Sequence, residues 1–186
     1  MTAVKPIYLI ALAAAVLFVI YLKISNPYRE FSTSAFWESA TLESVSGIPE
    51  EALKPGNKNG PVIMWAAIGS SNPKVLGALQ DRGADINESD GIFKGTPLTG
   101  AAGYTQNPKM LTELVRLGAD IHKPVHNGET ALMIAAQYNA NPSIITTLVK
   151  LGSVLDKKNN SGKTALDLAL RNKNEMAIKE LKSLAL

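Results

Sequence analysis

Two histidines are the residues of this chain whose types and spacing come closest to a chemical site. His122 and His126 are four residues apart, a spacing that would suit a metal ion if both lay on one helix. Pro124 lies between them, in a segment that we expect to be an extended loop. No carboxylate or cysteine is placed nearby to complete a ligand set, so we predict no metal site and no other cofactor.

A second short motif, Gly162-Lys163-Thr164, is similar to the end of a phosphate-binding loop. The upstream glycine and the preceding strand of that motif are both missing, and we interpret these residues as a turn followed by a helix cap. The chain has no cysteine, which excludes thiol nucleophiles and leaves the redox compartment open. No serine, histidine and acid fall in a plausible shared pocket, so we predict neither an enzyme nor a small-molecule substrate.

The net charge and the composition limit the remaining classes of function. The formal net charge is +3, too small to indicate a nucleic-acid interface. The 186 residues are 46% hydrophobic, which is ample for a packed core.

A repeat organises most of the chain. The segment "SSNPKVLGALQDRGADIN" begins at Ser70. A similar segment begins at Thr105, 35 residues later, and a third begins at Asn139, after a further 34 residues. Each copy predicts a helix that is capped by asparagine, has proline at its first position and ends at a glycine. Apolar residues at positions i, i+1 and i+4 predict one buried stripe. The three copies supply Asn72, Asn107 and Asn141 as caps, Val75, Leu76, Leu79, Met110, Leu111, Leu114, Ile144, Ile145 and Leu148 as stripes, and Gly83, Gly118 and Gly152 as ends.

A shorter helical pattern precedes each copy and recurs once more near the C-terminus. It reads "PVIMWAA" at Pro61, "TPLTGAA" at Thr96, "TALMIAA" at Thr130 and "TALDLAL" at Thr164. Threonine can cap the helix, and the paired alanines are small enough to let neighbouring helices approach closely. Each unit is therefore predicted to be a helix, a tight turn, a second helix and an extended loop, with Trp65 in the core.

These patterns resemble the ankyrin repeat, in which T-P-L-H-x-A-A opens the first helix and G-A-D-hydrophobic-N follows the second. "TPLTGAA", "GADIN" at Gly83 and "GADIH" at Gly118 carry the resemblance, which covers about Phe36 to Leu184. It implies an all-α solenoid with a degenerate first repeat or N-terminal cap at 31–59 and four repeats at 60–186, the last of which is a C-terminal cap. In this cap we expect Met176, Ile178 and Leu181 to face the neighbouring repeat. The array is expected to be monomeric.

The first 30 residues predict a membrane anchor. Apolar residues run without interruption from Ile7 to Leu22, and a helix over about 6–25 would be roughly 30 Å long, which just spans a bilayer. A cleaved signal peptide and a buried soluble helix are the alternatives. Positive charge is balanced on the two sides of the segment, and the short N-terminal arm favours export of the repeats. We therefore expect a bacterial inner-membrane protein whose repeats lie in the periplasm.

The resemblance implies a non-enzymatic scaffold that binds a protein through the concave face formed by the loops and the first helices. An immunity protein that neutralises a toxin, or a helper of an envelope enzyme, would fit an exported array. The alternative is a structural tether that faces the cytoplasm and recruits a soluble partner to the membrane. The candidate binding residues on the loops and helix ends are Phe93, Lys94, Tyr104, Lys123, Val125, His126, Gln137, Tyr138 and Lys158. Phe93 is either tucked beneath its own turn or exposed as an anchor, and the equivalent repeat positions of Tyr104 and Tyr138 favour packing against the Asn-Pro turn.

Overall fold

The computed structural model of the chain describes residues 29–55, 61–90 and 94–186. The chain divides into two compact units, Met1–Glu30 and Phe31–Leu186. The predicted membrane span at about 6–25 lies outside the described residues. Among the residues that are described, no helix is both long enough and apolar enough to cross a membrane.

Every regular element in the described part of the chain is a helix, which confirms the all-α prediction. The helices, in chain order, are η1 (Arg29–Ser32), α2 (Ser34–Glu38), α3 (Leu42–Ser46), α4 (Glu50–Leu53), α5 (Val62–Gly69), α6 (Lys74–Asp81), α7 (Pro97–Tyr104), α8 (Pro108–Arg116), α9 (Ala131–Tyr138), α10 (Pro142–Lys150), α11 (Ala165–Arg171) and α12 (Glu175–Leu184).

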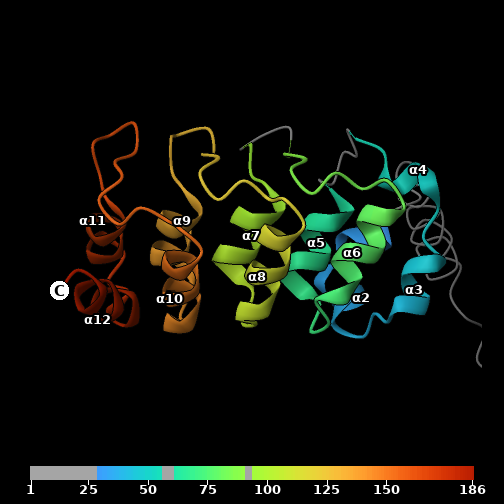
Figure 1. Ribbon diagram of the computed structural model, residues 1–186, viewed down its shortest axis with the longest axis horizontal. Helices are drawn as coiled ribbons and strands as arrows, with labels where there is room; N and C mark the ends of the chain where they lie inside the picture. Colours follow the sequence, from blue (N-terminus) through green and yellow to red (C-terminus); the bar gives the residue numbers. More distant parts are fainter. Residues whose placement is uncertain (1–28, 56–60, 91–93) are drawn as a thin grey trace, which may run out of the picture. The chain divides into compact units, whose positions relative to one another are not determined.

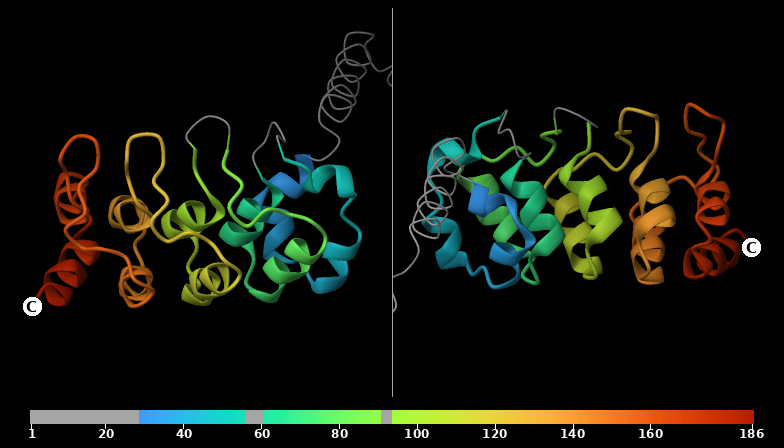
Figure 2. Two further views of the ribbon diagram at one scale, coloured as in Figure 1. Left: turned by 45° about the horizontal axis from the view of Figure 1, so that its top comes forward. Right: turned by 180° about the vertical axis from the view of Figure 1, so that it is seen from behind.

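The helices of the unit Phe31–Leu186 stack in two rows. In the first row α5, α7, α9 and α11 pack in succession, and in the second row α6, α8, α10 and α12 do the same. The loops that join one pair to the next all project to the same side, at the top of Figure 1. Figure 2 shows the two rows from other directions, with the first row exposed in the view from behind. This is the stacked arrangement that the repeat predicted.

Threonine caps and paired alanines build the first row. The side chains of Thr96, Thr130 and Thr164 each accept a hydrogen bond from the backbone N–H three residues further on. All three alanine pairs are buried, with no exposed surface on any member: Ala66 and Ala67, Ala101 and Ala102, Ala135 and Ala136. The small side chains therefore let the helices of this row pack closely, as predicted.

The second row follows the predicted stripes, caps and ends with one difference: α6 begins at Lys74, so Pro73 precedes the helix instead of occupying its first position. Asn107 and Asn141 cap α8 and α10, and the Oδ1 atom of Asn72 accepts a hydrogen bond from the backbone N–H of Lys74 in the same way. The nine stripe residues have no exposed surface. The helices α6, α8 and α10 then end before a glycine with positive φ, 97° at Gly118, which is the left-handed conformation that glycine adopts without steric cost.

The prediction for the C-terminal cap was wrong at one position. Met176 is 52% exposed, whereas Ala177, Ile178 and Leu181 are buried. Asn174 caps α12, so the first stripe position falls on Ala177, which is the third residue of the helix.

The capping asparagines also join neighbouring repeats, a role that their sequence pattern did not indicate. The Nδ2 atom of Asn107 donates to the carbonyl of Ser71 at 3.0 Å, and that of Asn141 donates to the carbonyl of Gln106 at 3.0 Å. Asn139 is 2% exposed, and its Nδ2 atom donates to the carbonyls of Ala102 and Thr105. These bonds fix the offset of one repeat against the next.

The first helices of this unit form an irregular pair. The helix α2 packs on α5, and α3 packs on α6, so the two extend the two rows. Trp37 has no exposed surface, and its indole Nε1 donates to the carbonyl of Phe31 at 2.8 Å. The guanidinium of Arg82, at the end of α6, donates to the carbonyls of Val45 and Ile48 and closes this end of the stack.

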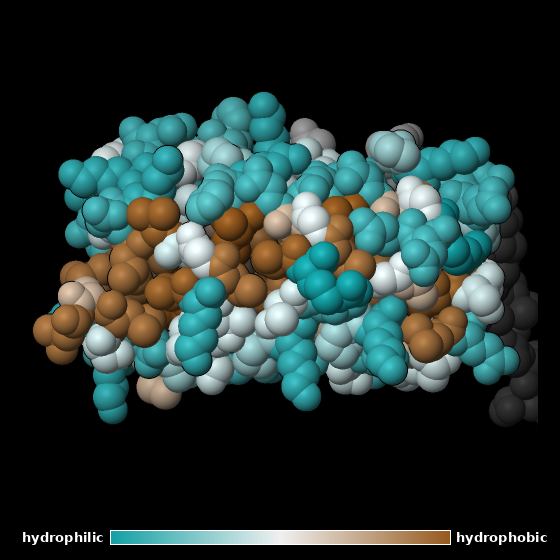
Figure 3. Space-filling view, viewed as in Figure 1, coloured by the Kyte–Doolittle hydropathy of each residue, from teal (hydrophilic) through white to brown (hydrophobic). Residues whose placement is uncertain are grey.

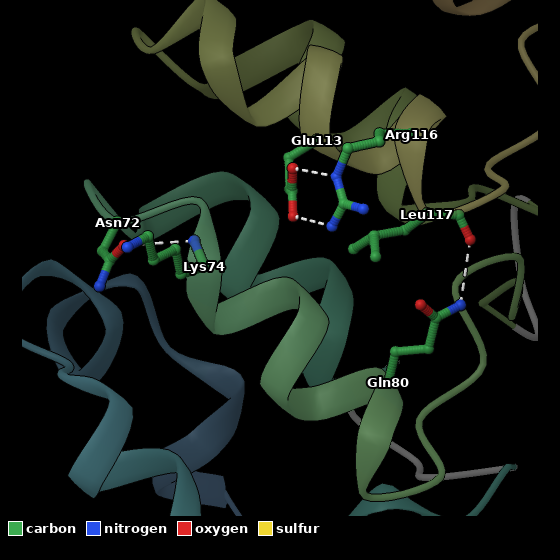
Figure 4. A network of polar contacts seen from close by, with 6 residues as sticks. All are labelled: Asn72, Lys74, Gln80, Glu113, Arg116 and Leu117. Atoms are coloured by element: carbon green, nitrogen blue, oxygen red, sulfur yellow. Dashed lines mark hydrogen bonds and ion pairs between the residues drawn. The ribbon is translucent and has the colours of Figure 1, made fainter.

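Polar contacts cover the outer side of α6 and α8 (Figure 4). The Nε2 atom of Gln80 donates to the carbonyl of Leu117 at 3.0 Å and joins two repeats. Glu113 and Arg116 form an ion pair at 2.7 Å, one helical turn apart. The hydrogen bond from Arg116 holds the pKa of the Glu113 carboxyl below its ordinary value. This exposed pair contributes little to stability, because solvent and salt screen the attraction between its charges.

Candidate functional site

A groove of about 570 Å³ lies along the first helices of three repeats, under the loops that precede two of them. Its walls come from α5, α7 and α9 and from the loops before α7 and α9. The residues that line it are Met64, Trp65, Ile68, Asp90, Gly95, Thr99, Gly100, Tyr104, Val125, His126, Asn127, Glu129, Ile134 and Tyr138.

Missing side chains on α7 leave room for this groove. Gly100 occupies the repeat position that Trp65 holds in α5 and Ile134 holds in α9. A Cβ atom at Gly100 would lie 3.0 Å from the Cγ atom of Met64 and 3.2 Å from the Cδ1 atom of Ile68. At Gly103 a Cβ atom would lie 3.1 Å from the Cγ2 atom of Ile134. The glycines thus allow both a close helix contact and a hollow above it.

Two tyrosines extend over the groove from the ends of their helices. Tyr104 on α7 and Tyr138 on α9 occupy equivalent repeat positions, and their rings stack with centroids 6.3 Å apart and an interplanar angle of 21°. They are 59% and 55% exposed, so the core does not need them. Large aromatic side chains that are placed on the surface in this way are typical anchors of protein interfaces.

Trp65 lies in the groove, so its prediction as a core residue was wrong. It is half-buried, and it lines the groove together with Ile68. The sequence could have indicated the partial exposure of Trp65 only through an alignment of the repeats. In that alignment the small residue Gly100 occupies the same position as Trp65.

Gln137 was expected at the binding face, but its side chain is buried and fully used. It is 6% exposed, its Nε2 atom donates to Glu129 at 2.9 Å, and its Oε1 atom accepts from Arg171 at 2.9 Å. The amide therefore joins its own repeat to the next and is not free to contact a partner. Its burial depends on Arg171 in the next repeat, which the sequence of one repeat does not reveal.

The basic loop residues differ in their accessibility. Lys94 and Lys158 are exposed at the loop tips, and Lys94 has a positive φ of 55°. Lys123 is half-buried, and its Nζ atom donates to the carbonyl of Asn87 at 2.9 Å, so it joins two loops rather than projecting freely. The loops thus present fewer free cations than the sequence predicted.

The remaining candidate residues lie beside the groove or outside the described part of the chain. Val125 is half-buried and His126 is exposed, and both line the groove. The backbone N–H of Val125 donates to the carbonyl of Glu129 and closes the loop tip. Phe93 lies outside the described residues.

No group of three or more histidine, aspartate or glutamate residues in the described part of the chain could hold a metal ion. His122 and His126 lie on the loop between α8 and α9, as expected. The Gly162-Lys163-Thr164 motif is a turn and a cap, because Gly162 has a φ of 71° and Thr164 caps α11. The interpretation of that motif is therefore confirmed.

The loops present a largely hydrophilic surface on the face drawn in Figure 3. In Figure 3 hydrophilic residues cover the upper region, where the loops project, and hydrophobic residues form a band beneath them. Loop side chains of this kind are not required by the core and are free to serve recognition.

Comparison with known proteins agrees with this architecture. The family model "Ankyrin repeats (3 copies)" matches residues 63–152 and 98–184. No curated protein matches the sequence. Ankyrin repeats are protein-interaction modules that are generally not catalytic. The repeated helix pairs, their caps and the family match together show that the chain belongs to the ankyrin repeat family.

Proposed function

We propose that the chain is a non-catalytic scaffold that holds a segment of a partner protein in the groove along α5, α7 and α9. The stacked pair of Tyr104 and Tyr138 is the observation that carries this proposal. The two large rings are 59% and 55% exposed at equivalent repeat positions. Their apolar surface is in contact with water, and a bound partner would cover it.

Site-specific photo-crosslinking in the source cells tests this proposal. A photoreactive amino acid replaces Tyr138 in the groove or, in the matched control, the exposed Lys109 on α8. We expect a discrete protein adduct from position 138 and none from position 109. Adducts from position 109 alone would place the partner on the second row of helices and contradict the proposal.

We further propose that the segment at 6–25 anchors the array in the inner membrane of a bacterium, with the repeats in the periplasm. The run of apolar residues from Ile7 to Leu22 supports this anchor, because it is long enough to cross a bilayer. A periplasmic scaffold would fit an immunity protein that neutralises a toxin or a helper of an envelope enzyme.

The second candidate is a tether whose repeats face the cytoplasm and recruit a soluble partner. The balance of positive charge on the two sides of the apolar segment keeps this candidate open, since a charge excess sets the orientation of such helices. Reporter proteins fused after Leu186 distinguish the periplasmic scaffold from the cytoplasmic tether. Activity of alkaline phosphatase there supports the periplasmic scaffold, whereas fluorescence of a reporter that folds only in the cytoplasm supports the tether. Recovery of the intact chain wholly in the soluble fraction would contradict both.

A further inference from the structure

The aromatic residues of the groove are accompanied by carboxylates. Trp65, Tyr104 and Tyr138 line the groove, and so do Asp90 and Glu129. The ring faces of tryptophan and tyrosine attract cations, and carboxylates add charge of the required sign. Among the described residues that line the groove, none is a lysine or an arginine.

Glu129 is the more unusual of the two acids, because it is only 6% exposed. One of its oxygens accepts from the amide of Gln137 at 2.9 Å, and the other accepts from the amide of Asn159 at 3.4 Å. Both donors are neutral. Within the part of the chain that the structure describes, the ion pair between Glu113 and Arg116 is on the second row of helices, and Glu129 has no cationic partner.

A buried carboxylate without a cation is costly, and a cation supplied by a ligand would offset that cost. Asp90 is half-buried on the preceding loop, where its Oδ2 atom accepts from the backbone N–H of Gly95 at 3.1 Å. The groove therefore combines aromatic surface with negative charge, and it is complementary to a cationic side chain.

We propose that the groove receives an arginine side chain from an extended segment of the partner protein, with the guanidinium against the aromatic rings and facing Asp90 and Glu129. Arginine is assigned in preference to lysine because its planar guanidinium stacks on aromatic rings, is more weakly hydrated than an ammonium and pairs with carboxylates through two parallel hydrogen bonds. This inference rests on the proposed scaffold function and specifies the chemistry of its partner.

Peptide pools of defined composition test the proposal with the full chain in mild detergent. Fluorescein-labelled nonapeptides carry arginine, lysine or citrulline at the central position and random uncharged residues elsewhere, and their binding is followed by fluorescence anisotropy. Citrulline has nearly the shape of arginine but no charge. We expect the arginine pool to bind about ten-fold more tightly than the citrulline pool, and more tightly than the lysine pool.

Tryptophan emission gives a second readout, because the chain has two tryptophans and Trp37 has no exposed surface. Unlabelled arginine pools should change the emission of Trp65 in a Trp37→Phe background, and citrulline pools should not.

Variants of the chain show which residues produce the preference for arginine over citrulline. Asp90→Asn and the pair Tyr104→Leu with Tyr138→Leu should each reduce the preference for arginine over citrulline, and so should Glu129→Gln if it folds. Glu175→Gln, which removes an exposed carboxylate on α12, is the matched control and should leave the preference unchanged.

Equal binding of the arginine and citrulline pools, or no binding of the arginine pool, would overturn the inference. So would a lysine pool that binds as tightly as the arginine pool. None of these results would affect crosslinking from position 138 in cells, whose failure would instead contradict the proposed function itself.

Discussion

At the scale of single residues, backbone conformation determines how the substitution of two glycines changes the stability of the fold. Gly118 has a φ of 97°, and no atom lies within 4 Å of the position that a Cβ atom would occupy there, so a substitution strains the backbone alone. Gly77 lies inside α6, where a Cβ atom would make an ordinary contact with Leu117 at 3.9 Å. Gly118→Ala should destabilise the fold by about 1–2 kcal/mol, whereas Gly77→Ala should stabilise it by about 0.5–1 kcal/mol. Urea unfolding measures both changes, and effects of the same sign would contradict the assigned conformations.

Asp167 gives a residue-scale prediction about pH. Its carboxylate accepts from the backbone N–H of Thr164 at 2.9 Å and from its hydroxyl at 3.0 Å, and these bonds hold the pKa of Asp167 below its ordinary value. A carboxyl whose pKa is lower in the folded chain stabilises the fold above its unfolded pKa, and this stability is lost as the pH falls through the folded pKa. In Asp167→Asn the free energy of unfolding should therefore fall less steeply on the acid side than in the wild type. Identical acid-side slopes in a pH series of urea unfolding would argue against this cap.

At the scale of helices, the stripe of the second row consists of fully buried apolar side chains that stabilise the stack. Leu114 has no exposed surface at the centre of the stack. Leu114→Ala should cost about 2–5 kcal/mol, because it removes a buried side chain and leaves a cavity. The control Val154→Ala truncates a residue that is 47% exposed and should change stability by less than about 0.5 kcal/mol. Comparable losses in the two variants would mean that the stripe is misassigned.

Helix caps and stripes could be predicted from the sequence because each depends on residues within one repeat. Asn107, Pro108 and Gly118 specify the start and end of α8 by local hydrogen bonding and backbone geometry. The register of α12 differs from the prediction, because its cap, Asn174, is followed by glutamate and not by the proline that marks the start of the earlier copies.

The candidate site was predicted less completely, because its properties depend on contacts between repeats. The burial of Gln137 results from Glu129 and Arg171, and Arg171 belongs to the next repeat. Trp65 lines the groove together with Gly100 from the following helix, so its place there also depends on two repeats. Tyr104 and Tyr138 were expected at helix ends, but their exposure was not predicted, because their equivalent repeat positions favoured packing against the Asn-Pro turn.

At the scale of the whole molecule, the repeats bury their stripes against one another. A chain that begins at Phe31 should therefore remain soluble, helical and monomeric, because the unit Phe31–Leu186 contains its own core. Circular dichroism and light scattering after size-exclusion chromatography measure this. Aggregation of the shortened chain would show that the first 30 residues contribute to folding.

The central claim is that a partner protein binds in the groove along α5, α7 and α9. The most direct measurement is the affinity of the full chain for the partner recovered by crosslinking, compared between the double variant Tyr104→Ala with Tyr138→Ala and the single variant Lys109→Glu. All of these side chains are exposed, so neither variant should lower the melting temperature much. We expect the double variant to lose at least about ten-fold in affinity, mainly through faster dissociation, and Lys109→Glu to bind as the wild type does. Loss of binding in Lys109→Glu together with unchanged binding in the double variant would contradict the account.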